Sequence, residues 1–121
     1  MSGAGGREDL IRKLSQSSET TITVTGRTSK RRVSVPVWFV VEGDTVLLVP
    51  TKGSRNEWFR NLQEDPTIEL GTPGAGHVFR ARLVKGHDEV EGVLDKFRAK
   101  YRSMWSEAYY TNRDVYVEVP I

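Results

Sequence analysis

The turn from Pro50 to Glu57 carries the residue types best suited to bind an anion. Ser54, followed three residues later by Glu57, has the spacing of a capping box, in which the two side chains bind amides at a helix start. A helix start also presents unpaired N–H groups and the positive end of the helix dipole. With Lys52 and Arg55 beside it, this turn predicts a phosphate or carboxylate site. A capped helix with solvated basic residues is the alternative interpretation.

Basic residues are concentrated around this turn. The chain has 121 residues and a net charge of only +2, from 18 Lys and Arg against 16 Asp and Glu. This balance disfavours nucleic acid as a partner, because bulk electrostatic attraction to a polyanion needs a larger excess. Between residues 27 and 60, however, seven basic side chains stand against three acidic ones. The seven are Arg27, Lys30, Arg31, Arg32, Lys52, Arg55 and Arg60.

Several other kinds of chemistry are disfavoured. The chain has no cysteine, which excludes disulfides, thiolate metal sites and a thiol nucleophile. Its two histidines, His77 and His87, are separated by strand residues and have no thiolate neighbours, so we expect no metal site. The glycines at 71, 74 and 76 lack the spacing of a dinucleotide-binding loop, and no nucleophile elbow supports a hydrolytic triad.

Six strands and three helices must position these residues. Residues 1–6 are expected to form a flexible tail, and the helical spacing of Leu10, Ile11 and Leu14 predicts a short first helix. Alternating or β-branched runs predict strands over Thr20–Thr25, Val33–Val41, Thr45–Thr51, Thr67–Leu70, His77–Lys85 and Asp114–Val119. Helices are predicted from Arg55 to about Gln63 and, after a second capping box at Asp88 and Glu91, to Tyr101.

The connections favour antiparallel pairing in a single α+β domain over residues 7–121. Glu42, Gly43 and Asp44 form a hairpin turn, and a small, partly closed β-barrel with flanking helices accounts best for the order of elements. Pro36 and Pro50 cannot donate to a β-ladder, so the backbone there is expected at an edge, at a bulge or beside a ligand.

The location of the protein is predicted from two further features. No apolar run is long enough to span a bilayer, and the first residues do not form a basic and then hydrophobic export signal. We therefore expect a cytoplasmic protein without a transmembrane segment. The strand Val33–Val41 is apolar on both faces, so it is expected either to line a closed barrel or to form the seam of a homodimer.

Several of these residues together resemble the deazaflavin (F420)-dependent nitroreductase family, within the pyridoxamine phosphate oxidase-like split β-barrel flavin-binding proteins. The resemblance covers roughly residues 20–85. It is carried by Gly26, Arg27, Ser29, Pro36, the turn of Lys52, Gly53 and Ser54, and the run of Trp58, Phe59, Asn61, Leu62 and Pro66. It implies a split barrel of about six antiparallel strands that binds coenzyme F420, or alternatively FMN.

The resemblance also implies a set of site residues. Lys52, Gly53, Ser54 and Arg55 would hold the cofactor phosphate, in agreement with the independent argument from charge. The ring would be lined by Ser34, Val35, Pro36, Val49, Pro50 and Thr51, with Trp58 packed at the helix start. A basic loop of Arg27, Lys30, Arg31 and Arg32 would meet the acidic tail of a deazaflavin; a solvated hairpin end is the alternative.

Membership would make the protein a reductase that transfers hydride to a quinone, a nitro compound or a similar conjugated acceptor. No side chain need act as nucleophile, because the cofactor carries the chemistry. Tyr109 and Tyr110 are candidates to donate a proton or to shape the acceptor pocket. The alternative is a binding module without turnover. Such a module would bind a cofactor, another anion or single-stranded nucleic acid, through basic residues and the aromatic side chains of Trp38 and Trp58.

The sequence departs from the family pattern at three positions. Lys30 stands where relatives usually have a second glycine, and the arginine before the strand comes one place early, as Arg32. Flavin-binding cousins commonly carry a lysine two residues beyond the turn serine, where this chain has Asn56. That last difference favours F420 slightly over FMN.

Overall fold

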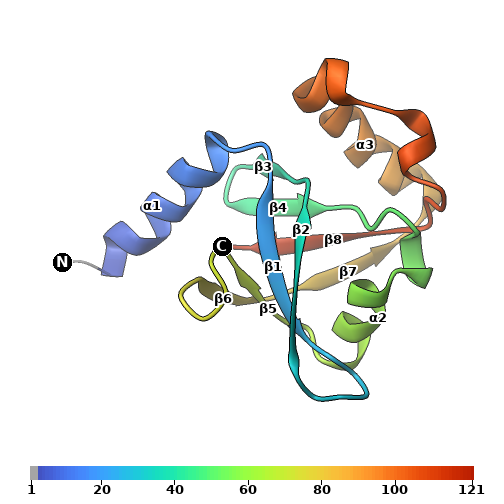
Figure 1. The fold of residues 1–121 in the computed structure, drawn as a ribbon. Coiled ribbons are helices and arrows are strands. Elements are labelled where there is room, and N and C mark those ends of the chain that lie inside the picture. The colour runs from blue at the N-terminus through green and yellow to red at the C-terminus, as the bar shows by residue number, and fades with distance from the viewer. Residues whose placement is uncertain (1–2) are drawn as a thin grey trace.

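Two four-stranded antiparallel sheets form the body of the molecule over residues 3–121, the part of the chain that the computed structural model describes (Figure 1). The first sheet has the order β2-β1-β5-β6, from β1 (Thr20–Thr25), β2 (Arg32–Val37), β5 (Thr67–Leu70) and β6 (His77–Arg80). The second has the order β3-β4-β8-β7, from β3 (Val40–Glu42), β4 (Thr45–Leu48), β7 (Arg82–Lys85) and β8 (Val115–Pro120). The predicted α+β class with antiparallel strands is confirmed.

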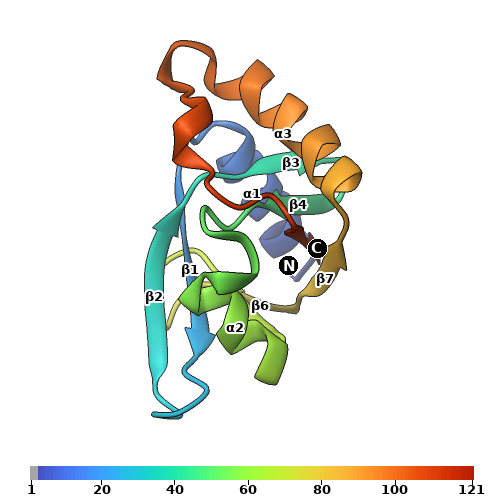
Figure 2. The ribbon, with the colours of Figure 1, turned by 90° about the vertical axis from the view of Figure 1, so that its right-hand side faces the viewer.

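The helices lie around these sheets (Figures 1 and 2). Those described are α1 (Gly3–Ser15), α2 (Glu57–Glu64) and α3 (His87–Tyr101), with short 3₁₀ helices η1 (Gly53–Arg55), η2 (Arg102–Met104) and η3 (Glu107–Tyr109). Helix α3 packs on the second sheet, and α2 packs near β1. None of the helices within residues 3–121 combines the length and the hydrophobicity that a membrane-spanning helix requires.

Two of the six predicted strands divide, which raises the number over the described residues to eight. The predicted strand Val33–Val41 breaks after Val37 into β2 and β3, and His77–Lys85 breaks at Ala81 into β6 and β7. Each pair of pieces belongs to different sheets. At each break a buried residue binds outside the ladder: the Phe39 amide donates to the Tyr101 hydroxyl (2.9 Å), and the Ala81 amide to the Pro66 carbonyl (2.8 Å).

Two apolar cores follow from this arrangement. The larger lies between the sheets and includes Ile22, Phe39, Leu48 and Val117, all fully buried. The second lies between α3 and the outer face of the second sheet, where Leu47 and Val49 meet Leu94, Phe97 and Tyr110. Successive residues from Val46 to Val49 therefore point alternately into the first core and the second core, which explains why this stretch is apolar throughout.

Both predicted capping boxes are wrong. Helix α2 starts at Glu57, after Asn56, and Ser54 lies in η1, where its hydroxyl donates to Asp114. Helix α3 starts at His87, and the Glu91 carboxylate binds arginines rather than an amide at the helix start. In both places a side chain with the sequence spacing of a cap binds a charged residue outside its own helix start instead: Ser54 binds Asp114, and Glu91 binds Arg113.

The N-terminal segment and the loop at Lys30 differ from expectation in informative ways. Helix α1 begins at Gly3, so residues 3–6 of the segment expected as a flexible tail are helical; Met1 and Ser2 lie outside the described residues.

Lys30 has a φ of 62°, in the left-handed region that favours glycine. This conformation accounts for the glycine that relatives are expected to carry there.

Candidate active site

A groove of about 240 Å³ opens where β2 of the first sheet faces the end of β4 and the turn before α2. Its lining brings together five of the residues expected around a cofactor ring: Val35, Pro36, Val49, Thr51 and Trp58. The remaining lining residues are Val37, Trp38, Asn56 and Tyr109. The walls are thus mainly apolar and aromatic, with two small polar side chains near the turn.

Two other residues expected at the ring are placed differently. Ser34 shares a hydrogen bond of 2.8 Å with Thr23 across the β1–β2 ladder. Pro50 is buried, and its carbonyl accepts a hydrogen bond from the Gly53 amide (2.9 Å). Among the described residues, these two therefore shape the strand and the turn that border the groove, outside its lining.

The turn expected to bind an external anion holds the carboxylate of Asp114. The Ser54 amide donates to Asp114 Oδ1 (2.9 Å), and the Ser54 hydroxyl donates to Oδ2 (2.5 Å). Burial alone would raise the pKa of Asp114, but hydrogen bonds, first from Ser54 and then from the Asp114 amide and Asn112, together hold this pKa below its usual value. The carboxylate in this turn therefore comes from the chain itself, and the binding of a cofactor phosphate there stays a prediction.

Gly53 and Asn56 complete the turn. Gly53 has a φ of 58°, and a Cβ there would lie 2.2 Å from Asp114 Oδ1 and 2.6 Å from the Asn112 carbonyl oxygen. The Asn56 side-chain oxygen accepts from the Lys52 amide (3.1 Å) and from the Thr51 hydroxyl (3.3 Å). The side chains of Lys52 and Arg55, next in sequence to the lining residues Thr51 and Asn56, are exposed. They are the parts of this turn that face solvent with full positive charge.

The basic loop borders a second hollow of about 280 Å³, lined in part by Arg27, Ser29, Val33 and Asn61. Arg27 donates through its guanidinium to Asn61 Oδ1 (2.8 Å) and to Glu57 (2.9 Å), and through its amide to the same Asn61 oxygen (3.0 Å). Asn61 is buried, so its role in the helix motif is to fasten this loop to α2.

The other basic residues of the loop differ in their surroundings. Arg32 pairs with Glu69 at 3.3 Å and also donates to the Thr25 hydroxyl (3.1 Å). Lys30 and Arg31 are exposed at the hairpin tip. The loop therefore presents some of its charge to solvent and uses the rest to hold its own shape.

The two tyrosine candidates have different environments. Tyr109 lines the groove, is 53% exposed, and lies 5.5 Å from the Trp38 ring, which itself stacks on Tyr101 at 4.1 Å. Tyr110 is buried in the core under α3, where it stacks on Trp105 and where burial raises its pKa. Of these two side chains, only Tyr109 is among the described residues that face the groove.

Comparison with known proteins decides the family. The model of the F420H2-dependent quinone reductase family matches residues 4–121. The chain belongs to this family of enzymes. Its members are oxidoreductases that depend on F420H2, so coenzyme F420 is the cofactor of first choice and FMN the alternative. A search of curated proteins gives no match.

Solved structures agree with this quinone reductase family in their fold. An F420-H2 dependent reductase (FDR-A) has a TM-score of 0.57 at 21% identity, over 84% of this chain and 93% of the other. A candidate pyridoxamine 5′-phosphate oxidase from Listeria innocua has a TM-score of 0.61 at 12% identity, over 93% and 90%. A protein described as a domain-swapped dimer has a TM-score of 0.59 at 21% identity, over 93% and 95%. The split-barrel fold is therefore shown.

The groove of this quinone reductase family member suits part of such a cofactor. Its apolar walls fit a flat, fused ring. Pro36 in the lining also suits such a ring, because proline has no backbone N–H that an apolar ring surface would leave without a hydrogen bond. At about 240 Å³ it is smaller than the roughly 300 Å³ typical of sites that enclose a whole drug-sized ligand. A ring held here would leave the rest of the cofactor outside the groove, beside the exposed Lys52 and Arg55.

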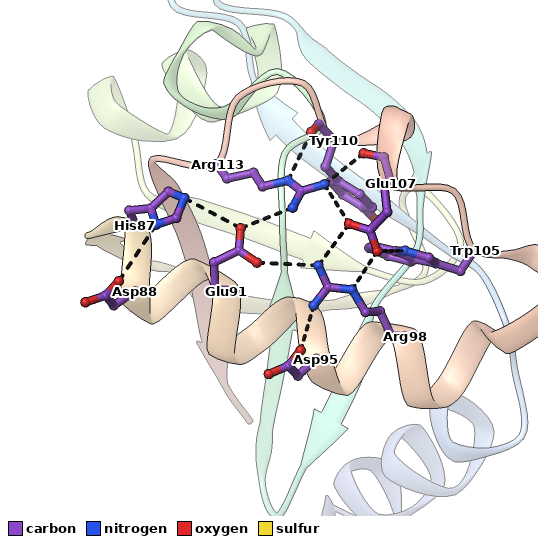
Figure 3. Close-up of polar contacts among 9 residues, drawn as sticks. All are labelled: His87, Asp88, Glu91, Asp95, Arg98, Trp105, Glu107, Tyr110 and Arg113. Carbon is purple, nitrogen blue, oxygen red and sulfur yellow. Dashed lines mark hydrogen bonds and ion pairs between the residues drawn. The ribbon is translucent and has the colours of Figure 1, made fainter.

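Sequence reasoning missed the polar residues that join this site to α3. Figure 3 shows Glu91 and Arg98 on α3 in contact with Glu107 and Arg113 from the segment beyond it. Glu91 was expected in a capping box, and its contacts with two arginines were not expected. No local spacing identifies these contacts, because Arg113 lies 22 residues from Glu91.

Proposed function

We propose that this oxidoreductase uses reduced F420 to transfer hydride to a quinone, a nitro compound or a similar conjugated acceptor at the groove. One observation carries the proposal: residues from β2, from the stretch that follows β4 and from the start of α2 line a single apolar groove with an aromatic edge. Bound F420 supplies the hydride. The protein's part is to bind the ring, exclude water from it and orient the acceptor.

Each part of the groove has a distinct role in this proposal. Val35, Pro36 and Val49 give apolar contact along the ring, and Trp58 gives a large flat surface beside it. Thr51 and Asn56 place polar atoms near the turn. Tyr109 lies at the edge of the groove with half of its surface exposed, where it can contact an acceptor and donate a hydrogen bond to the oxygen that gains charge.

The phosphate of the cofactor is proposed to bind the side chains of Lys52 and Arg55. The Ser54 amide and hydroxyl are committed to Asp114, so these two exposed cations carry this role. For the acidic tail we propose Lys30 and Arg31 as the main contacts, because both are exposed at the hairpin tip. Arg27 and Arg32, which have internal partners, would contribute through their remaining N–H groups.

The test is a parallel fluorescence titration of the purified protein with F420 and with FMN. We expect F420 to bind more tightly, followed by oxidation of F420H2 with menadione as the quinone acceptor and with a nitroarene as the competing acceptor. Tighter binding of FMN would reverse the choice of cofactor. If neither binds, a single-stranded oligonucleotide titrated at low and high salt tests the binding-module alternative, because phosphate contacts weaken steeply with salt.

We also infer a homodimer. The edge strand β2 leaves Val33 39% exposed, and one solved structure of the same fold is described as a domain-swapped dimer. Light scattering at several protein concentrations tests this inference, and a monomer at all concentrations would refute it. The cytoplasmic location expected from the sequence remains a prediction.

A further inference from the structure

The segment from Arg102 to Asp114 crosses from the end of α3 to the start of β8 and carries Tyr109 to the groove. It contains only two short 3₁₀ helices, η2 and η3, so its backbone cannot be held in place by a helix or by a sheet ladder. Something else must fix the position of Tyr109. Charged side chains on α3 make some of these contacts (Figure 3). The turn before α2 makes others.

Arg113 holds the backbone on both sides of Tyr109. Its Nη2 donates to the carbonyl oxygen of Glu107 (2.8 Å), and its Nε donates to the carbonyl oxygen of Tyr110 (3.2 Å). The two carbonyls bracket Ala108 and Tyr109, so one guanidinium fixes both ends of the short stretch that carries the ring. The side chain of Arg113 is only 21% exposed, which limits competition from water.

Glu107 connects this stretch to α3. Its carboxylate accepts from Arg98 Nε (2.8 Å) and Nη2 (3.0 Å), from Arg113 Nη2 (3.0 Å), and from the indole N–H of Trp105. Glu91 bridges the same two arginines, at 3.1 Å to Arg113 and 3.4 Å to Arg98. The carboxylates of Glu91 and Glu107 thus each contact the guanidinium groups of both Arg98 and Arg113, so every charge in this cluster lies beside charges of the opposite sign. Paired fork geometry of this kind is the strong form of a salt bridge.

The far end of the segment is held by a separate set of contacts. The Thr111 amide donates to the Thr51 carbonyl (2.8 Å), and the Asn112 side chain donates to the Lys52 carbonyl (3.3 Å). Thr51 itself lines the groove. The stretch that carries Tyr109 is therefore held between the charged cluster on one side and the wall of the groove on the other.

We propose that Arg113 and Glu107 are positioning residues that set Tyr109 against Trp38 at the groove, and through it set the shape of the acceptor side. Neither residue is among those lining the groove, so neither touches the acceptor. The consequence for acceptor binding rests on the function proposed above. The effect on Tyr109 itself does not, because it concerns the protein alone.

The experiment combines an NMR readout with kinetics. The protein is labelled with 3-fluorotyrosine at its four tyrosines, and the ¹⁹F resonance of Tyr109 is assigned from Tyr109→Phe. The variants are Arg113→Met, Arg113→Lys and Glu107→Gln. Arg82→Met is the matched control, since it removes a guanidinium that is 70% exposed and pairs with Glu118 at 3.6 Å, away from this segment. Thermal melts confirm that each variant is folded.

We expect Arg113→Met and Glu107→Gln to move or broaden the Tyr109 resonance while the Tyr116 resonance stays in place. Arg113→Lys should give an intermediate change, because an ammonium cannot reach two carbonyls and two carboxylates together. Arg82→Met should leave the Tyr109 resonance unchanged. An unchanged Tyr109 resonance in both Arg113→Met and Glu107→Gln, or an equal change in Arg82→Met, would overturn the proposal.

The kinetic arm separates positioning from general damage. With F420H2 and menadione, Arg113→Met should raise the KM for menadione by about fivefold or more while the Kd for F420 stays within about twofold. A wild-type protein that does not turn over would refute the proposed function, and the ¹⁹F result would still decide the positioning role. Equal losses in F420 binding and menadione KM would contradict a role confined to the acceptor side.

Discussion

At the scale of single residues, the turn before α2 shows which negatively charged group its hydrogen-bond donors bind. The sequence predicts that this turn binds a negative charge, and the structure supplies one from Asp114, 60 residues away from Ser54. Composition and spacing identify donors well, because the side chains of Lys and Arg and the backbone N–H group can only donate hydrogen bonds. They cannot identify which acceptor the fold will bring there. Hence the donors of this turn can be identified from the sequence, whereas the carboxylate that Ser54 binds cannot.

Substituting Gly53 should be more destabilising than substituting Gly43. Both have positive φ, at 58° and 62°, so Gly→Ala introduces similar backbone strain at each, about 1 kcal/mol. Only at Gly53 would the new Cβ also meet Asp114 and the Asn112 backbone, whereas nothing lies within 4 Å at Gly43. We expect Gly53→Ala to lower the free energy of unfolding by about 1 to 3 kcal/mol more than Gly43→Ala. Urea unfolding of both variants measures the difference, and equal losses would contradict it.

The two exposed cations of the turn should contribute to cofactor affinity. Lys52→Ala and Arg55→Ala are each expected to weaken F420 binding by about 1 to 3 kcal/mol, as for hydrogen bonds to a charged group. Fluorescence titration of F420 gives the Kd values, and Arg82→Ala serves as a control for the loss of a surface cation. Unchanged affinity in both turn variants would remove the phosphate assignment.

At the scale of the elements, residue patterns predicted strands better than they predicted sheets. An alternating pattern persists through Phe39 and through Ala81, because the side chain at each bend still faces the interior. The ladder partner changes there, and partner choice depends on contacts distant in the sequence. For the same reason the groove was predicted only in part: five of its nine lining residues were expected around a ring, whereas Ser34 and Pro50 were expected there and lie outside the lining.

The bend at Phe39 depends on the last residue of α3. The buried Tyr101 hydroxyl accepts from the Phe39 amide (2.9 Å) and lies 2.8 Å from the Ser18 carbonyl oxygen, and burial raises its pKa to about 12. Tyr101→Phe leaves the Phe39 amide without this acceptor, so we expect a loss of about 1 to 3 kcal/mol in the free energy of unfolding. Tyr116→Phe is the control, since its hydroxyl binds only the Glu118 side chain among the described contacts. Chemical denaturation of both variants checks this, and an equal small loss would show that Tyr101 acts only through its ring.

At the scale of the whole molecule, several carboxylates accept hydrogen bonds that lower their pKa values. Glu107 is the clearest case: hydrogen bonds from Arg98 and Trp105 lower its pKa to about 2. Hydrogen bonds from Arg113 lower the pKa of Glu91, and those from the Thr67 amide and hydroxyl lower the pKa of Asp65. Asp114 belongs to the same group. These contacts predict how stability depends on pH.

A carboxylate whose folded pKa is lowered contributes stability above its unfolded pKa and loses that contribution as the pH falls through the folded value. The ordinary pKa values are 3.8 for Asp and 4.5 for Glu, and the folded pKa of Glu107 is about 2. We therefore expect the free energy of unfolding to decline as the pH falls from about 4.5 toward 2. Urea unfolding across this range measures it, and Asp114→Asn should show a shallower decline than the wild type. A flat profile in the wild type would contradict the expectation.

The position of β8 affects how the molecule can be made. This strand lies between β4 and β7 in the middle of the second sheet, although it consists of Val115 to Pro120. During synthesis, β4 and β7 therefore leave the ribosome without the strand that joins them, and their inner edges stay unpaired until residue 120 emerges. Until then the nascent chain exposes apolar strand edges, so a stall in translation within β8 would leave a chain that is prone to aggregate.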